Sequence, residues 1–427
     1  FDDISGWIDM LGAREGIANL EFFHGESEGN TEVIKVSSAS AGSANAAVTL
    51  TVASGYRQTT SQTAAPYIAT GSSTTIPVGV NDVIQFPDGT LGSCTAVSGN
   101  TFTVIPVVSG ANIPAVTTSS VLKNITTAVK EGADSVAAKF KNQYGYRNNM
   151  TRIRTSSNIS GDSFAIRDWI TNYGKSGASP HRYSEQLMDD YHRHRNKCEL
   201  AKLIGQRITN TTLANTSGFE TVLLSEGLIP WLESNANVVE YASTAAFSLA
   251  EIDTMGDYFT KYRGADTYDL WTDRSLSLAI DDVIGTDSRL AAGSVVYDNA
   301  REEKYANFGF DGFKRGGILF KKKMNKVFNL PEYLGGDNAY HNGIGILVPT
   351  DNVVTAPFGG SKPVSVPSLR TVYQISSDLP NKGTKEWSHG GSADVPTSGE
   401  RIMKYEVETV EALEPFAANR WGLFKIA

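Results

Sequence analysis

Apolar residues recur at helical spacing along two long stretches of the chain. The longer stretch runs from Pro180 to Ile208, and Ser179 and Pro180 are residue types that favour the first turn of a helix. Charged residues fill one side of this predicted helix. Six residues mark the face that we expect to be buried: Leu187, Tyr191, Cys198, Leu203, Ile204 and Ile208. At 1.5 Å per residue the helix would run roughly 40 Å, so it should lie along the edge of a larger body.

The second amphipathic helix has both of its ends marked in the sequence. Ser248 and Glu251 form the pattern of a capping box for a helix at Leu249–Arg263, and Gly264 is a typical left-handed stop. Asp273 is the expected cap of a further helix. A strand at Tyr268–Trp271 and a helix at Arg274–Val283 follow. These elements predict a small α+β body.

The last third of the chain favours strands. Its strand-like segments are Gly317–Lys322, Gly343–Val348, Leu369–Ile375 and Met403–Val410. In the last segment, apolar and hydroxyl side chains alternate with the charged Lys404, Glu406 and Glu408. Because successive strand residues point to opposite faces, this segment is predicted to have one buried face and one face in water.

A stretch near the N-terminus is almost free of charge. Val36–Leu122 contains only Arg57, Asp82 and Asp88 as charged residues, whereas the whole chain has 38 Lys and Arg and 46 Asp and Glu. Its strand-length segments are Ala46–Val52, Asp82–Gln85, Thr101–Val107 and Ala115–Val121. Turn residues separate these segments, which predicts an inserted β-rich domain over 33–122, built as a small sandwich or barrel.

The segments that flank this domain are predicted to reach beyond the core. Ile4, Trp7, Ile8 and Leu11 lie at helical spacing, and Phe22 and Phe23 follow. This apolar stripe packs either against its own domain or, as an arm, against a neighbouring subunit.

Beyond the inserted domain, the pattern predicts a helix at Asn124–Phe140 and then two extended strands at Gln143–Ser163. The strands contain Arg147, Arg152 and Arg154. Three arginines so close together have three possible roles: they form a solvent-exposed edge, pair with carboxylates of another chain, or contact nucleic acid.

Composition and motifs point away from catalysis. The net charge of −8 argues against tight nucleic-acid binding by the surface as a whole, although a local basic patch remains compatible with it. No phosphate-binding loop or nucleophile elbow is present, and no apolar run is long enough to span a membrane. His192 and His194 lie on different faces of the predicted helix, so we expect exposed or hydrogen-bonded histidines and no metal. We predict no catalytic residue, no cofactor and no enzyme activity. The strongest basic cluster is Lys321, Lys322 and Lys323, which fits a solvated strand end, an acidic neighbour or nucleic acid.

The order of these parts resembles the major capsid proteins of tailed bacteriophages, which have the HK97-like fold. Pro180–Ile208 resembles the family's spine helix, Tyr144–Ser160 its extended loop, and Arg401–Ala417 its final peripheral strand and return to the axial domain. The resemblance implies an α+β fold with an inserted all-β module. The implied divisions are an N-terminal arm (1–32), the inserted domain (33–122), the extended loop and return (123–178), a peripheral domain (179–226 and 365–410) and an axial domain (227–364 and 411–427).

The resemblance implies a structural protein that assembles into the icosahedral shell around packaged double-stranded DNA. The implied partners are copies of itself in hexamers and pentamers, portal, decoration or scaffolding proteins, and DNA through weak non-specific contacts, with no membrane. Host-surface glycans are a further partner for the insert. The implied location is the virion, assembled in the host cytoplasm, and a crAss-like phage is one source that fits. The residues predicted to contact other subunits are Trp7, Phe22, Phe23, Arg147, Arg152, Arg154, Lys321, Lys322 and Lys323. Two alternatives are a nanocompartment shell of the same fold and a carbohydrate-binding or carbohydrate-active surface protein.

Overall fold

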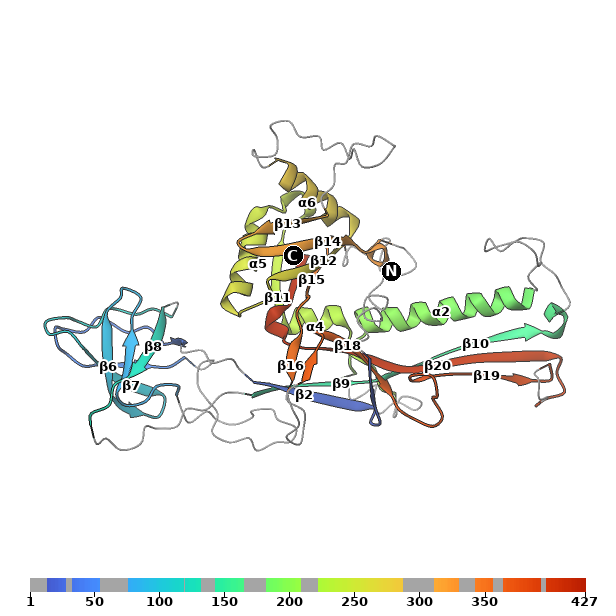
Figure 1. Ribbon diagram of the computed structural model, residues 1–427, viewed down its shortest axis with the longest axis horizontal. Helices are drawn as coiled ribbons and strands as arrows, with labels where there is room; N and C mark the ends of the chain where they lie inside the picture. Colours follow the sequence, from blue (N-terminus) through green and yellow to red (C-terminus); the bar gives the residue numbers. More distant parts are fainter. Residues whose placement is uncertain are drawn as a thin grey trace. The chain divides into compact units, whose positions relative to one another are not determined.

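The computed structural model in Figure 1 describes residues 14–27, 33–53, 76–118, 120–131, 143–164, 182–208, 222–286, 311–329, 342–355, 364–392 and 397–427. Many strands and a few helices make up this part of the chain, which confirms the predicted α+β class. The chain divides into two compact units, one made of Phe1–Phe22 with Asn148–Ala427 and the other of Phe23–Arg147.

The Phe23–Arg147 unit contains a six-stranded sheet over residues 33–127, which we call the insert module. Its strands lie in the order β3-β8-β5-β6-β7-β4. Their bounds are β3 (Val33–Lys35), β4 (Val48–Thr51), β5 (Asp82–Gln85), β6 (Leu91–Ser98), β7 (Thr101–Pro106) and β8 (Val121–Thr127). Burial alternates along β5 and β7, and Ile84, Phe102 and Val104 lie in the core. The predicted strands at β4, β5 and β7 are therefore present, whereas β6 was not predicted.

Two predictions about the end of this module are wrong. The strand expected at Ala115–Val121 begins only at Val121, and the helix expected from Asn124 is instead the second half of β8. Leu122 and Asn124 both point into the core, and the Asn124 amide donates to the buried carboxylate of Asp82 at 2.7 Å. Because the polar Asn124 occupies a core position, the alternation of buried and exposed residues along β8 was not recognised as that of a strand. Residues 132–140 of that expected helix lie outside the described part of the chain.

A two-stranded sheet brackets the insert module in the sequence. Its strands are β2 (Glu21–Ser27), before the module, and β9 (Gln143–Asn149), after it. The next strand, β10 (Thr151–Ser160), pairs with β20 and not with β9. The two expected extended strands therefore exist, but they belong to different sheets.

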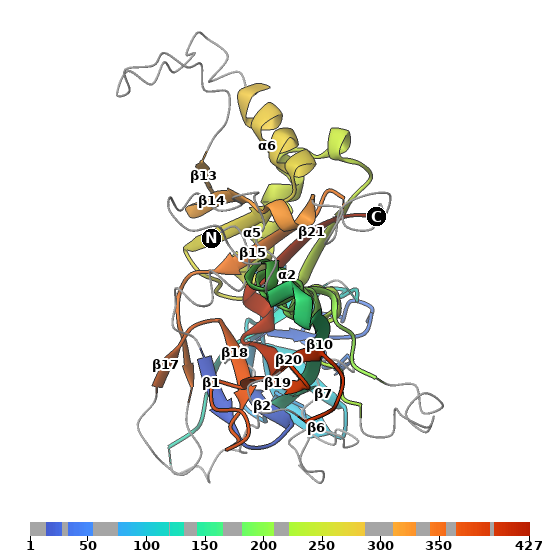
Figure 2. The same ribbon diagram turned by 90° about the vertical axis from the view of Figure 1, so that its right-hand side faces the viewer.

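We call the sheet that contains β10 the long-strand sheet. Its order is β1-β18-β20-β10, with β19 also paired to β20 (Figure 2). The remaining bounds are β1 (Arg14–Ile17), β18 (Leu369–Gln374), β19 (Thr384–Gly390) and β20 (Ile402–Pro415). The predicted strands at Leu369 and Met403 are thus present, the second of them longer than expected. Phe22, Met150 and Val410 belong to one hydrophobic cluster of this sheet.

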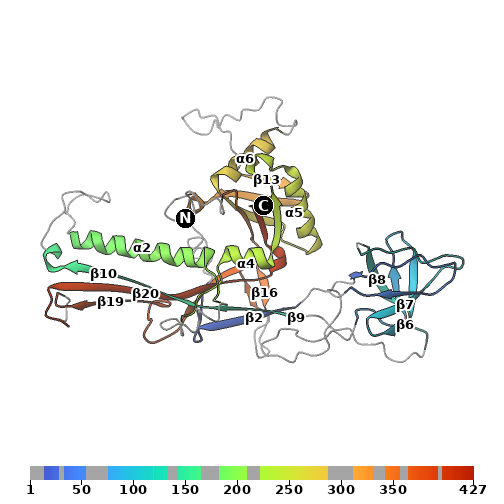
Figure 3. The same cartoon turned by 180° about the vertical axis from the view of Figure 1, so that it is seen from behind.

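The predicted long helix is α2 (Arg182–Ile204), which packs along β10 and β20 in Figures 1 and 3. Its buried face is the predicted one in part: Cys198 and Leu203 are buried as expected, whereas Tyr191 and Ile204 are exposed. The buried side chains include Asp190, His194 and Lys202. Ser179 and Pro180, the predicted start, lie outside the described residues.

The second sheet of this unit, which we call the two-helix sheet, has the order β11-β21-β15-β12-β14-β13. Its bounds are β11 (Asn237–Tyr241), β12 (Thr267–Thr272), β13 (Gly312–Arg315), β14 (Ile318–Met324), β15 (Gly345–Pro349) and β21 (Gly422–Ile426). Helices α5 (Leu249–Lys261) and α6 (Arg274–Thr286) bury residues against one hydrophobic cluster of the sheet, where Phe259 stacks on Tyr268 at 4.0 Å. A short helix and a two-stranded sheet complete the described elements: α4 (Leu228–Asn235), β16 (Val353–Thr355) and β17 (Val364–Val366).

The caps of these helices follow the predicted pattern, with one exception. Ser248 and Glu251 form the capping box of α5, and the carboxylate of Asp273 accepts from the backbone of Leu276 at 2.9 Å at the start of α6. The left-handed residue after α5 is Arg263 (φ 54°) and not Gly264. Gly264 serves close packing instead, because a Cβ atom there would collide with the Tyr268 hydroxyl.

The order of elements in the described chain is the one that the resemblance to HK97-like capsid proteins implies. An extended two-stranded segment comes first, and a long helix on long strands follows. A compact sheet with two helices comes next, and the chain returns through β18 and β20 to end in β21 of that compact sheet.

Candidate subunit-contact surfaces

The two phenylalanines predicted to contact other subunits have different environments. Phe22 is 4% exposed and packs in the chain's own core. Of the two alternatives for the N-terminal apolar stripe, this residue therefore follows packing against its own domain and not against a neighbouring subunit. Phe23 is 43% exposed. Trp7 lies outside the described residues.

Two of the three predicted contact arginines point away from α2 on the long-strand sheet. On β10, Thr151, Thr155 and Ile159 are buried, whereas the even-numbered residues are exposed. Arg154 donates from Nε to Glu408 at 2.8 Å, and Arg152 lies 3.4 Å from the same carboxylate. Both arginine side chains are more than half exposed, so they remain available to a neighbour in addition to this intrachain pairing. Arg147 is half-buried on β9.

The prediction that Glu408 points into water is wrong. Glu408 is 8% exposed, and Glu411 and Glu414 further along β20 are also buried. Each carboxylate has a cation from another element: Arg154 of β10 for Glu408, Lys202 of α2 for Glu411 (2.8 Å), and Arg370 of β18 for Glu414 (2.6 Å). The carboxylates of β20 therefore join three neighbouring elements to one strand.

A seam of polar side chains joins α2 to the long-strand sheet. His194 is 4% exposed, and its two ring nitrogens lie 3.0 Å from the hydroxyl of Thr155 and 2.9 Å from that of Thr409. Burial lowers the pKa of His194 below 6.5, so that its neutral form is favoured. Burial also raises the pKa of Cys198, one turn further along α2, to about 12, which keeps it a thiol.

We expected His194 to be exposed or hydrogen-bonded, and it is hydrogen-bonded. The other buried polar residues of α2 around it were not predicted. A usable signal was present, since Asp190, His194, Cys198 and Lys202 recur at every fourth residue of α2 and are all buried. Because most of these residues are polar, the usual search for apolar residues at helical spacing does not select them.

The three lysines of β14 have three different environments. The Lys322 side chain is 9% exposed and its ammonium group lies 2.5 Å from Asp281 of α6, so it cannot reach another subunit. Lys323 pairs with Asp269 at 2.7 Å and lies over the Trp271 ring. Lys321 is exposed. Trp231, Trp271 and Trp421 are buried.

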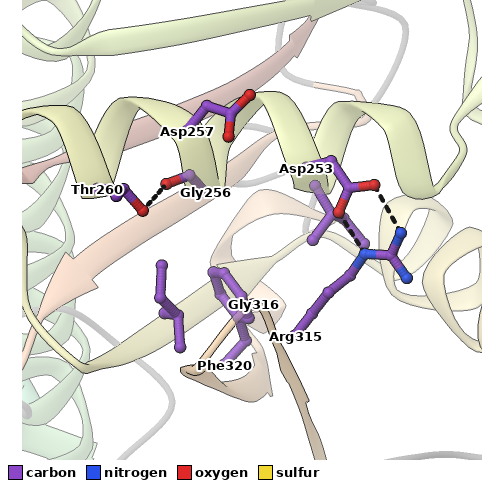
Figure 4. Close-up of a pocket in the computed structure, with 9 residues that line it drawn as sticks. Asp253, Gly256, Asp257, Thr260, Arg315, Gly316 and Phe320 are labelled. Atoms are coloured by element: carbon purple, nitrogen blue, oxygen red, sulfur yellow. Dashed lines mark hydrogen bonds and ion pairs between the residues drawn. The ribbon is translucent and has the colours of Figure 1, made fainter.

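A groove of about 210 Å³ lies between α5 and the β13–β14 hairpin (Figure 4). Asp253 of α5 forms two hydrogen bonds with the guanidinium of Arg315 of β13, one of them 2.6 Å long. This pairing lowers the pKa of Asp253. The apolar residues that line the groove are Ile252, Ile318 and Phe320. The groove is thus apolar inside and acidic along α5.

The described residues contain no group of three or more His, Cys, Asp or Glu side chains placed to hold a metal ion. None of the described helices is long and apolar enough to cross a membrane.

Comparison with solved structures finds shell proteins. The capsid structure of cyanophage P-SCSP1u is 14% identical, with 71% of this chain and 80% of that chain covered at a TM-score of 0.34. The capsid asymmetric unit of cyanophage Pam1 is 10% identical, with 70% and 82% covered at 0.36. The holo-SrpI encapsulin complex from Synechococcus elongatus PCC 7942 is also 10% identical, with 70% and 79% covered at 0.34.

No protein-family model matches the chain, and no curated protein matches it in sequence.

Proposed function

We propose that this chain is the major capsid protein of a tailed phage and that it assembles into a closed icosahedral shell around double-stranded DNA. The observation that carries this proposal is the order of parts: an extended two-stranded segment, a long helix on long strands, and a compact sheet closed by the C-terminal strand. The long-strand sheet with α2 corresponds to the peripheral domain of the HK97-like fold, and the two-helix sheet corresponds to its axial domain.

Extended segments make physical sense in a shell subunit. A two-stranded sheet such as β2–β9 is at best marginally stable alone in water, so its faces are expected to be covered. Phe22 of β2 packs in the chain's own core, and we expect a neighbouring copy in the shell to cover the opposite side of the strand. Phe23, on β2, is an exposed aromatic residue of the kind that such a contact would cover.

The insert module extends this proposal to further partners. Its nearly uncharged, Ser- and Thr-rich sequence suits the outside of a shell, where neighbours, decoration proteins or host-surface glycans are the partners in reach. Portal and scaffolding proteins are expected partners elsewhere on the subunit, and the packaged DNA is expected to make only weak contacts with a chain of net charge −8.

Particle size tests the proposal. We expect the purified chain, expressed with the other head proteins of its phage, to form closed particles that are seen by electron microscopy and light scattering. A nuclease-protected duplex inside the particles supports the capsid assignment, whereas particles filled with protein instead of DNA support a nanocompartment. A stable monomer at high concentration overturns both, and would favour the surface carbohydrate-binding protein.

A further inference from the structure

The β13–β14 hairpin has two exposed lysines on one face and the carboxylates of α5 beside the other face. Ile318 and Phe320 point to the cluster under α5, so Leu319 and Lys321 point to the other face of the sheet. Lys314 of β13 is paired with Leu319 and therefore lies on the same face as Lys321. Both lysines are exposed. Neither has an ion pair among the described residues, unlike Lys322 and Lys323.

The opposite face of the hairpin holds the acidic groove. Asp253 and Asp257 lie four residues apart on α5, where like charges repel. Arg315 neutralises Asp253, but Asp257 is exposed and has no ion pair among the described residues. Lys261, one turn further along, donates instead to the Tyr262 hydroxyl at 3.1 Å. The groove therefore keeps one uncompensated carboxylate beside an apolar floor.

We propose that this groove is an interface between copies of this chain, in which it receives the lysines Lys314 and Lys321 of a second copy. A lysine fits the groove through its charge, because its ammonium group can pair with the exposed carboxylate of Asp257, whereas Ile318 and Phe320 are buried in the chain's own core. Every copy carries the groove on one face and the two lysines on the other. A head-to-tail contact of this kind repeats from copy to copy and closes into a ring when the rotation allows it.

A second copy is the partner that the charges favour. The chain is acidic overall, so a face with two lysines that have no ion pair among the described residues attracts another copy, and the acidic groove selects the lysine face over the rest of that copy's surface. The inference rests on the proposed function, since it assigns one contact of the shell to named residues.

Charge reversal in matched variants tests the contact. Asp257→Lys makes both surfaces basic, and Lys314→Glu with Lys321→Glu makes both acidic. We expect each variant to remain a folded subunit with wild-type circular dichroism and to lose particle assembly. Mixing the two variants should restore association between them, measured by light scattering, because the basic groove of one meets the acidic hairpin face of the other; alternation of the two is possible in pairs and in even-membered rings. Lys382→Glu, at an exposed turn of the long-strand sheet, is the control and should assemble normally.

Normal assembly by both single-surface variants, or failure of the mixture to recover, overturns the contact while wild-type particles still support the proposed function. Disulfide cross-linking tests the contact even when the wild-type chain forms no particles or a charge-reversal variant fails to fold. The Asp257→Cys and Lys321→Cys subunits, mixed under oxidation, should form a disulfide-linked dimer, since both native cysteines are buried. Absence of that dimer, with Asp257→Cys mixed with Asn158→Cys as the control, also overturns the contact.

Discussion

At the scale of single residues, the packing of α2 on the long-strand sheet depends on polar groups that are buried but paired. His194, Lys202 and Glu411 are all less than 10% exposed, and each has a hydrogen-bonding or charged partner across the α2 seam. Buried polar groups of this kind stabilise a structure only while every partner is present. Their protonation and their substitution should therefore have large effects.

Protonation of His194 should weaken the α2 seam. Its pKa in the folded chain lies below the ordinary 6.5, so the unfolded chain binds the proton first as the pH falls. Stability should therefore be complete above about pH 6.5 and decline below it. We expect His194→Gln to show a smaller loss of melting temperature than wild type between pH 8 and pH 5.5, with subunits in one assembly state. His192→Gln, at an exposed position of the same helix, should keep the wild-type slope. Equal slopes in all three proteins would contradict this role.

Removing one member of the buried Lys202–Glu411 pair should be costly. Lys202→Met leaves the Glu411 carboxylate buried without its cation, which is expected to lower the free energy of unfolding by about 3–5 kcal/mol. The double variant Lys202→Met with Glu411→Leu removes both charges and should recover most of that loss. Urea unfolding measures both values. A single variant as stable as wild type would show that water reaches Glu411.

These residues mark the limit of what the sequence reveals about the contact surfaces. The exposure of Lys321 and the burial of the three tryptophans agree with simple expectations. The burial of Glu408 and Lys322 does not, because their partners, Arg154 and Asp281, are 254 and 41 residues away in the chain. Ion pairs between residues far apart in the chain produce no pattern in the sequence around either residue.

At the scale of elements, the predictions succeeded where apolar residues recur at a regular helical or strand spacing. Helix α5 was located by its cap and its apolar face, and β20 by the alternation at Met403–Val410. Helix α2 was located, but only part of its buried face was predicted, because Asp190, His194 and Lys202 on that face are polar. The strand β8 was taken for a helix because Asn124 occupies a core position. The failures therefore fall where a polar side chain is buried with a specific partner.

The insert module should be separable from the rest of the chain. Its first and last strands, β3 and β8, are neighbours, with Lys35 opposite Val121, so its two ends leave from one place. Replacing 33–127 by a short Gly/Ser linker should leave the remaining unit folded, because loop length has a small entropic cost. The module alone should give a dispersed NMR spectrum and cooperative melting. A disordered module together with an aggregating remainder would show that the two share a core.

At the scale of the whole molecule, one strand links the two sheets of the larger unit. β20 runs for 14 residues in the long-strand sheet, and the chain then reaches β21 in the two-helix sheet within seven residues. The alternation near the C-terminus predicted a strand at Met403–Val410, and only the resemblance to HK97-like capsid proteins implied the return to the second sheet. The pairing of β20 with β10, β18 and β19 was not predictable, because strand partners lie far apart in sequence.

That linkage gives the subunit a mechanical property. Tension that pulls β21 away along the direction of β20 loads the hydrogen bonds of three strand pairs in shear, so many bonds must break together instead of opening one at a time. The β16–β17 hairpin, with three paired residues on each strand, lies outside this load path. A pull on β21 would therefore be carried by a strand with three partners, whereas a hairpin of three paired residues such as β16–β17 has few hydrogen bonds to resist a pull on its own ends.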